Sequence, residues 1–147
     1  MLLPEKIDFD GPFPKLSRRL RLGVVGGGRI AGTQAIAARL SDRWDIVAGA
    51  FSSNPEKAKA AAAEWFLPEE RCYTSFAEMA QAEAAREDGV DAVMITTPNH
   101  MHHPAAKAFL EAGIDVLCDK PLTNEVAEAD DLVALTRQTG CVFGVSY

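Results

Sequence analysis

The feature that most constrains the fold is a regular alternation of short apolar runs with helix-like segments. The apolar runs, read as strands, cover residues 20–25, 45–51, 71–73, 90–96, 114–118 and 141–145. The segments between them, read as helices, cover residues 29–40, 55–65, 75–86, 104–112 and 123–138. Strands that alternate with helices of about 10–15 residues are typical of a parallel sheet covered on both faces. The sequence therefore predicts an α/β fold with a doubly wound parallel sheet in a three-layer α/β/α arrangement.

Length and charge narrow the class of protein further. The chain has 147 residues, of which 48% are hydrophobic and 24% charged, as in an ordinary globular domain. With 15 Lys and Arg against 21 Asp and Glu, the net charge is −6, which does not suit a nucleic-acid partner. Pro4, Pro12 and Pro14 interrupt residues 1–19, which show no periodicity. We expect an N-terminal arm at residues 1–19 and one domain at residues 20–147.

The cysteines and the hydropathy of the chain indicate its compartment. Cys72, Cys118 and Cys141 are odd in number, far apart and without a C-x-x-C pair, so we interpret them as buried free thiols in a reducing environment. The first residues lack the apolar core of a signal peptide, and no apolar run is long enough to span a membrane. The sequence thus predicts a cytoplasmic protein with no membrane partner.

The stretch GVVGGGRIAG joins the first predicted strand to the first predicted helix. Gly26, Gly28 and Ala31 follow the spacing G-x-G-x-x-A, which provides a tight turn, an open approach for a pyrophosphate and close helix packing. The helix that begins at Arg29 and Ile30 offers free N–H groups and its positive dipole end to phosphates. A glycine-rich turn without a ligand is the alternative. The strand–turn–helix context favours a Rossmann-type dinucleotide site.

The end of the second predicted strand bears on the choice of dinucleotide. Rossmann folds usually place an acidic residue there to bind the adenosine ribose. Here Ser52 and Ser53 take that place, followed by Asn54 and, one turn later, Lys57. Small hydroxyls beside a lysine tolerate a 2′-phosphate, so these residues favour NADP, with NAD as the alternative. Ser53 or Asn54 is also expected to cap the following helix.

The stretch TTPNHMHHP follows the fourth predicted strand, at the carboxyl edge where ligands bind in such sheets. Its three histidines invite a metal interpretation. No Cys, Asp or Glu lies nearby to complete a metal site, so we expect no metal and favour contact with a polar ligand. His100 and His103 are expected to be exposed surface residues.

The stretch LCDKPL places a charge pair at the end of a buried apolar run. Asp119 and Lys120 follow the run at once, and Pro121 prevents the strand from continuing. One interpretation is a strand that ends at the surface, where charged residues are common. The other is that Lys120 is a positioned catalytic group.

Together these motifs resemble those of the glucose–fructose oxidoreductase, inositol dehydrogenase and rhizopine-catabolism (Gfo/Idh/MocA) family. The resemblance lies in GGGRIAG, TPNHMH and DKP, and it covers residues 20–147 in order. It implies that Lys120 is catalytic, lying by the nicotinamide and hydrogen-bonding the substrate hydroxyl that loses hydride. Asp119, also an expected cofactor contact, stands where the family usually has glutamate. The resemblance further implies a cofactor-side loop made of Thr97, Pro98, Asn99 and His102.

The sequence therefore predicts the NAD(P)-binding domain of an oxidoreductase that transfers hydride between a nicotinamide cofactor and a sugar, cyclitol or related polyol. The family continues into a second α/β domain that supplies most of the substrate pocket, and we expect that domain to be absent from this chain. The chain alone is expected to bind dinucleotide without turnover, and the full-length protein to be a homo-oligomer. The alternatives are a non-catalytic dinucleotide-sensing module and an S-adenosylmethionine-dependent methyltransferase domain.

Overall fold

Five parallel strands form the sheet at the centre of the protein. The computed structural model describes residues 16–147, and within them the strand order is β2-β1-β3-β4-β5. The strands, each paired in parallel with its neighbours, are β1 (Leu20–Val25), β2 (Trp44–Ala50), β3 (Ala92–Ile95), β4 (Asp115–Asp119) and β5 (Phe143–Ser146). The chain places β2 on one side of β1 and then returns to place β3 on the other, as in a doubly wound sheet. The predicted fold class is confirmed.

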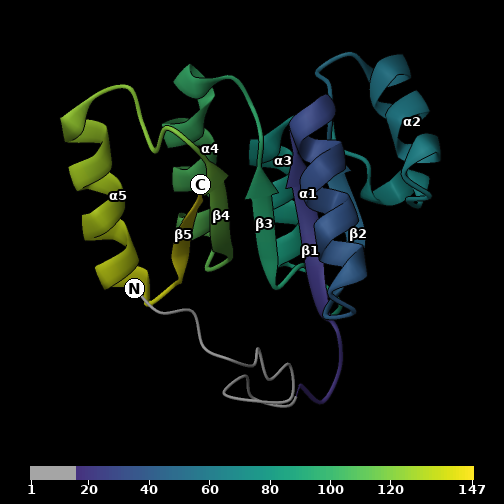
Figure 1. Cartoon of the computed structure of the whole chain (residues 1–147), viewed down its shortest axis with the longest axis horizontal. Helices are drawn as coiled ribbons and strands as arrows, with labels where there is room; N and C mark the ends of the chain where they lie inside the picture. The colour runs from purple at the N-terminus through teal and green to yellow at the C-terminus, as the bar shows by residue number, and fades with distance from the viewer. Residues whose placement is uncertain (1–15) are drawn as a thin grey trace, which may run out of the picture.

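Helices cover both faces of this sheet. Those of the described residues are α1 (Arg29–Leu40), α2 (Pro55–Glu64), α3 (Phe76–Ala84), α4 (His102–Glu111) and α5 (Val126–Thr139), with the 3₁₀ turns η1 (Glu69–Arg71) and η2 (Asn99–Met101). In Figure 1, α1 lies in front of β1 and β2, whereas α3 and α4 lie behind the sheet. Helix α5 packs beside α4. The predicted three layers are therefore present.

Each face of the sheet buries its own apolar cluster, because successive residues of a strand point to opposite faces. On the side of α4, Val93 and Ile95 of β3 belong to the same cluster as Phe109. On the side of α1, Met94 belongs to a second cluster that includes Ala31. Ala31 is fully buried, so the small residue predicted at this position does let α1 pack closely on the sheet.

The predicted third strand at residues 71–73 is not a strand. Its first residue, Arg71, is the last residue of the 3₁₀ turn η1, and only an isolated parallel bridge joins Cys72 to Gly49. The physical reason is the side chain of Arg71, which turns inward to a buried ion pair with Glu83 of α3. The sheet of the described residues therefore has five strands and not six.

The helix starts follow the predicted caps at α2 and α3 but not at α5. The side chain of Asn54 accepts a hydrogen bond from the N–H of Lys57 at 3.0 Å, and that of Ser75 accepts one from Glu78 at 3.1 Å. From the sequence, Ser75 with Glu78 three residues later is predicted to form a capping box, and residue 123 or 124 is predicted as the cap of α5. The cap is instead Glu125, which forms a capping box with a second glutamate three residues later.

Most of the predicted N-terminal arm lies outside the described residues. Its last part is described, and Arg18 there forms an ion pair with Asp91, just before β3. Arg19 forms an ion pair with Asp42, just before β2. These two pairs tie the chain to the amino edge of the sheet.

The three cysteines are free, as predicted. Only Cys118 is fully buried, whereas Cys72 and Cys141 are partly exposed, so the expectation of three buried thiols is wrong for two of them. Burial raises the pKa of Cys118 to about 12. This thiol is therefore protonated and unreactive at neutral pH.

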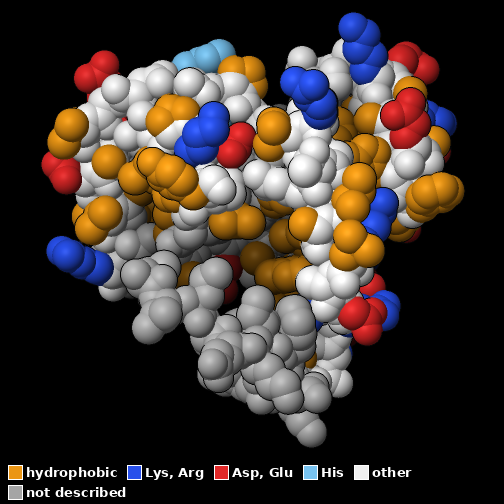
Figure 2. All heavy atoms as spheres, in the orientation of Figure 1, with side chains coloured by type: hydrophobic (Ala, Val, Ile, Leu, Met, Phe, Trp, Pro, Cys, Tyr) orange, Lys and Arg blue, Asp and Glu red, His pale blue; other side chains and the backbone are white. Residues whose placement is uncertain are grey.

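A hollow of about 310 Å³ lies on the α1 side of the sheet. Apolar side chains gather in this hollow of the front face (Figure 2), among them Leu22, Trp44 and Met94. Leu117 of β4 also lines it and is 39% exposed, because α1 packs toward β2 and away from β4. We call this feature the apolar hollow.

Candidate functional site

A cleft of about 340 Å³ opens at the carboxyl edge of the sheet, where β1, β2 and β3 end. The strand order reverses between β1 and β3, and this switch point is where doubly wound sheets bind ligands. The loops after the three strands and the segment before α3 form its sides. The lining residues are Val25, Gly26, Gly27, Ala50, Phe51, Ser52, Ser53, Thr74, Ser75, Phe76, Thr97, Pro98 and Met101.

Gly26 and Gly28 are both needed as glycine, for different reasons. Both have a positive φ, 93° and 89°, a backbone region that side chains disfavour. A Cβ on Gly26 would lie 2.8 Å from the carbonyl carbon of Thr96, so this glycine lets the loops after β1 and β3 approach each other. A Cβ on Gly28 would meet no atom of the described chain within 4 Å. The backbone at Gly28 is therefore open to a ligand.

The first turn of α1 is suited to an anion. Its N-cap is Gly28, which provides no side-chain hydrogen bond, and the turn contains no acidic residue. The N-termini of α2 and α3, in contrast, are capped by Asn54 and Ser75. The unbonded N–H groups and the positive dipole end favour a phosphate. The hydroxyl of Thr97 in the adjoining cleft is buried and, within residues 16–147, has no hydrogen-bond partner, so the cleft also fits the polar parts of a dinucleotide.

The end of β2 presents hydroxyl groups to this cleft. Ser52 and Ser53 both line it, and the hydroxyl of Ser52 accepts a hydrogen bond from the N–H of Asn54 at 3.2 Å. Lys57 is exposed in the first turn of α2, outside the lining residues. Phe51, which also lines the cleft, packs its ring on Trp65, with 5.1 Å between ring centroids. This edge of the cleft therefore offers neutral donors and acceptors to a ribose.

His102 does not take the predicted place in the cofactor-side loop. It is the first residue of α4, two residues before the predicted start, and only 1% exposed. Its Nδ1 lies 2.7 Å from the carbonyl oxygen of Pro121, and its Nε2 lies 3.0 Å from that of Thr97. Both ring nitrogens are thus used inside the protein, so the imidazole has no nitrogen left for a direct contact with a cofactor.

Lys120 lies directly after β4, with an exposed side chain. Its backbone N–H donates to the carboxylate of Asp119 at 3.0 Å, and the hydroxyl of Ser146 in β5 donates to the same carboxylate oxygen at 3.1 Å. The bond between Lys120 and Pro121 is a cis peptide. No ion pair joins the ammonium to Asp119 or to another of the described residues. The backbone of this lysine is therefore held, while its amino group stays available.

The cleft gathers part of the predicted set of cofactor residues. Those that line it are Gly26, Ser52, Ser53, Thr97 and Pro98. Those outside the lining are Gly28, Arg29, Ile30, Lys57, Asn99, His102, Asp119 and Lys120. The lining residues that the sequence did not predict as cofactor contacts are Val25, Gly27, Ala50, Phe51, Thr74, Ser75, Phe76 and Met101. Ser75 carried only a capping signal, and nothing in the sequence indicated that the segment before α3 would return to the end of β2.

The histidines of the same loop differ in exposure. His100 is exposed, as predicted. His103 is not a plain surface residue, since its Nε2 lies 2.8 Å from the carboxylate of Asp131 in α5. Lys107 donates to that carboxylate at 2.9 Å, and hydrogen bonds from Lys107 and then His103 lower the pKa of Asp131. His103 therefore joins α4 to α5.

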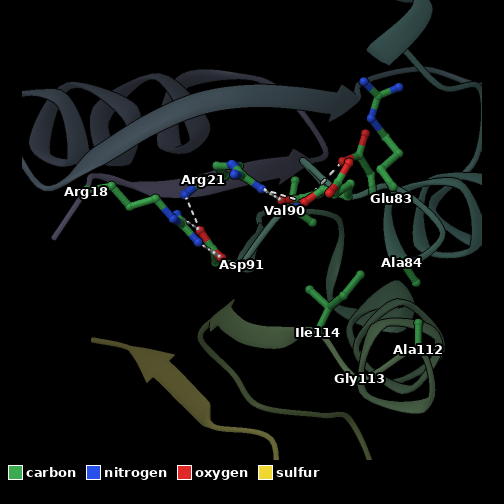
Figure 3. A pocket seen from close by; sticks show the side chains of 12 residues that line it. Arg18, Arg21, Glu83, Ala84, Val90, Asp91, Ala112, Gly113 and Ile114 are labelled. Carbon is green, nitrogen blue, oxygen red and sulfur yellow. Dashed lines mark hydrogen bonds and ion pairs between the residues drawn. The ribbon is translucent and has the colours of Figure 1, made fainter. Parts of the chain in front are cut away.

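A second concavity lies at the opposite, amino edge of the sheet (Figure 3). It is rich in arginine, but each guanidinium is already engaged. Arg18 binds Asp91 through two hydrogen bonds of 2.7 Å, and Arg21 donates to the carbonyl oxygens of residues 87 and 89. Arg86 binds Asp88 at 2.8 Å. Because each guanidinium already donates its hydrogen bonds within the chain, this concavity is not suited to bind an anion.

Neither a metal cluster nor a membrane-spanning helix is found in the part of the chain that the structure describes. Across residues 16–147, no three His, Cys, Asp or Glu side chains are grouped so that they could hold a metal ion. None of the helices in the same range is both long and apolar enough to cross a membrane.

The switch-point cleft, the open glycine turn and the uncapped helix define the chain as a Rossmann-type dinucleotide-binding domain. More particularly, it belongs to the Gfo/Idh/MocA family, because the model of that family, described as "Oxidoreductase family, NAD-binding Rossmann fold", matches residues 20–147. The resemblance seen in the motifs is thereby confirmed, and the cofactor is NAD or NADP.

Several known oxidoreductases resemble the chain in sequence and structure. An oxidoreductase from Sinorhizobium meliloti has a crystal structure with a TM-score of 0.84 and 48% identity, covering 88% of this chain and 37% of its own. An inositol dehydrogenase homolog from Azotobacter vinelandii, complexed with NADH and myo-inositol, has a TM-score of 0.85 and 34% identity, covering 89% of this chain and 35% of its own. The uncharacterized oxidoreductase YfiI of Bacillus subtilis is 38% identical over 136 residues, which are 90% of this chain.

The chain spans 35% of the length of the Bacillus protein. It spans 34% of an inositol 2-dehydrogenase from Corynebacterium glutamicum, to which it is 34% identical over 123 residues, or 84% of this chain.

Proposed function

We propose that this domain serves an oxidoreductase that transfers hydride between NAD(P) and a hydroxyl-bearing carbon of a sugar, cyclitol or related polyol. The observation that carries the proposal is the placement of Lys120, whose backbone is held at the carboxyl end of β4 while its amino group has no ion-pair partner among the described residues. The inositol dehydrogenase relatives support the substrate class.

The chain's own residues would bind the cofactor and manage one proton. The turn at Gly26 and Gly28 and the first N–H groups of α1 would hold the pyrophosphate, and Ser52 and Ser53 would contact the adenosine ribose. When bound, the nicotinamide supplies the hydride chemistry. Lys120 Nζ would hydrogen-bond the substrate hydroxyl and hold its proton as hydride leaves the same carbon, which is general acid–base catalysis.

The rest of the substrate pocket would come from a second domain, as the 34–35% coverage of the relatives suggests. We infer that the full-length protein is cytoplasmic, which the three free cysteines support, and that it forms a homo-oligomer. The present chain would bind dinucleotide but would not turn over substrate.

The test is replacement of Lys120 by Met and by Ala in the full-length oxidoreductase that carries this domain. We expect kcat to fall about a hundredfold or more, the scale of a positioned proton-transfer group. Dinucleotide affinity and melting temperature should stay close to those of the unmodified enzyme, because the exposed ammonium makes no ion pair among the described residues. Near-normal turnover in both variants would mean that the domain only holds the cofactor.

A further inference from the structure

One buried imidazole joins the cofactor cleft to the turn that carries Lys120. His102 approaches the carbonyl oxygen of Thr97, which follows β3 and lines the cleft, and that of Pro121, which follows β4. The ring is 1% exposed, so neither substrate nor cofactor reaches it. Neighbouring strands β3 and β4 therefore end in loops that are bridged through a single side chain.

We propose that His102 is a positioning residue that sets where Lys120 stands relative to the bound dinucleotide. The inference rests on the proposed function, because it acts through Lys120. On its amino side, the N–H of Lys120 donates to the carboxylate of Asp119, which also accepts a hydrogen bond from the hydroxyl of Ser146 in β5. On its carboxyl side, the next carbonyl, that of Pro121, is held by His102. The backbone on the two sides of the lysine is thus linked by hydrogen bonds to β5, through Asp119, and to α4, through His102.

The two contacts of the His102 ring are not equivalent, because a neutral imidazole has only one N–H to donate. Both partners are carbonyl oxygens, which only accept hydrogen bonds. A neutral imidazole carries one N–H and a protonated imidazole carries two. The contact from Nδ1 to Pro121 is the shorter, 2.7 Å against 3.0 Å from Nε2 to Thr97, which favours the tautomer that carries its proton on Nδ1. The bond to the lysine turn is therefore the primary one.

Two amide substitutions separate the contacts. In His102→Asn the side-chain amide takes the place of Nδ1 and can still donate to Pro121. In His102→Gln it takes the place of Nε2 and can donate only toward Thr97. His102→Leu removes both bonds, and His103→Leu is the matched control, because His103 contacts α5 and not the lysine turn.

The experiment measures kcat, KM, dinucleotide affinity and melting temperature for these variants and for Lys120→Met, in the full-length oxidoreductase. We expect His102→Leu and His102→Gln to lower kcat about tenfold or more, because small misplacements of a catalytic group are costly. Dinucleotide affinity should change by less than about threefold, as for an interaction made mainly in the transition state. His102→Asn should recover most of kcat, and His103→Leu should keep it.

The possible outcomes separate this inference from the proposed function. If Asn and Gln variants with equal melting temperatures lose kcat equally, or if neither loses any, His102 is merely structural and the inference is overturned. Since His102→Leu can fail to fold, the Asn–Gln comparison decides alone. If Lys120→Met keeps its turnover, the proposed function fails first; if it loses turnover while all His102 variants keep theirs, only the inference fails.

Discussion

Gly26 and Gly28 belong to one motif, but glycine is required at the two positions for different reasons. Gly26 is needed by the folded chain itself, because a Cβ would collide with the backbone of Thr96. Gly28 has open space in front of it, so the need for glycine comes from its positive φ and from the ligand. The sequence motif predicted both positions but could not separate these two causes.

Substitution of each glycine by alanine should therefore give different results. Gly28→Ala should clearly weaken NAD(H) binding, measured by calorimetric titration, while its melting temperature falls less than that of Gly26→Ala. Gly26→Ala should lower the melting temperature further, since backbone strain of about 1–2 kcal/mol adds to a direct clash. Equal loss of stability in both variants, with equal loss of affinity, would contradict this assignment.

Ser53 allows a test of cofactor preference at a single position. The absence of a carboxylate at residues 51–54 predicts that NADP binds at least as tightly as NAD. Ser53→Asp should shift the ratio of the two affinities toward NAD, because the carboxylate repels a 2′-phosphate and can accept the 2′-hydroxyl. Ser53→Asn is the matched neutral control. A strong preference of the unmodified chain for NAD would show that the premise is wrong.

At the scale of elements, the segment between β2 and α3 departs most from the sequence prediction. Residues 71–73 look like a strand, yet Arg71 and Glu83 form a buried ion pair instead. Glu83 also accepts hydrogen bonds from Tyr73 at 2.7 Å and from the N–H of Val90 at 3.1 Å. Burial, and then the bond to Glu83, raise the pKa of Tyr73. Partners twelve residues apart, from different elements, cannot be read from local periodicity.

Replacing one member of this buried ion pair should strongly destabilise the folded protein. Glu83→Ala removes the buried partner of Arg71 and leaves its guanidinium only a 3.5 Å ion pair with the largely exposed Asp88. The variant should therefore cost about 3–5 kcal/mol in the free energy of unfolding, measured by urea denaturation. The double variant Arg71→Met/Glu83→Leu should lose less than the single one, because no charge is left buried. Glu69→Ala, which breaks an exposed pair with Lys59, is the control and should leave the urea midpoint unchanged. A double variant worse than Glu83→Ala would argue against this reasoning.

At the scale of the whole molecule, the alternation of strands and helices was sufficient to predict the parallel sheet and its layers. The motifs also placed the glycine turn and the lysine correctly at strand ends. What the sequence could not supply were contacts that depend on the third dimension. The buried position of His102 and the return of Thr74 and Phe76 to the cleft both arise from packing between distant segments.

The apolar hollow gives a prediction for the chain as a whole. Exposed apolar surface of this kind binds hydrophobic dyes and other apolar surfaces. Leu117→Gln should lower the fluorescence of bound anilinonaphthalene sulfonate, with little change in melting temperature, because Leu117 is already 39% exposed. Val126→Gln, at a position that is 79% exposed but outside the hollow, should leave the dye signal unchanged. Equal dye binding by all three proteins would mean that the hollow is closed in solution.

The strand order also bears on how the chain folds during synthesis. β1 is synthesised first and pairs with both β2 and β3. Because β3 follows β1 by about seventy residues, one side of β1 stays unpaired until β3 has been synthesised. Such non-local pairing slows folding and leaves the unpaired side of β1 exposed to wrong partners. β4 and β5 then add one after the other to a formed edge. The part of the sheet that carries the glycine turn can therefore form before the segment that carries the lysine has left the ribosome.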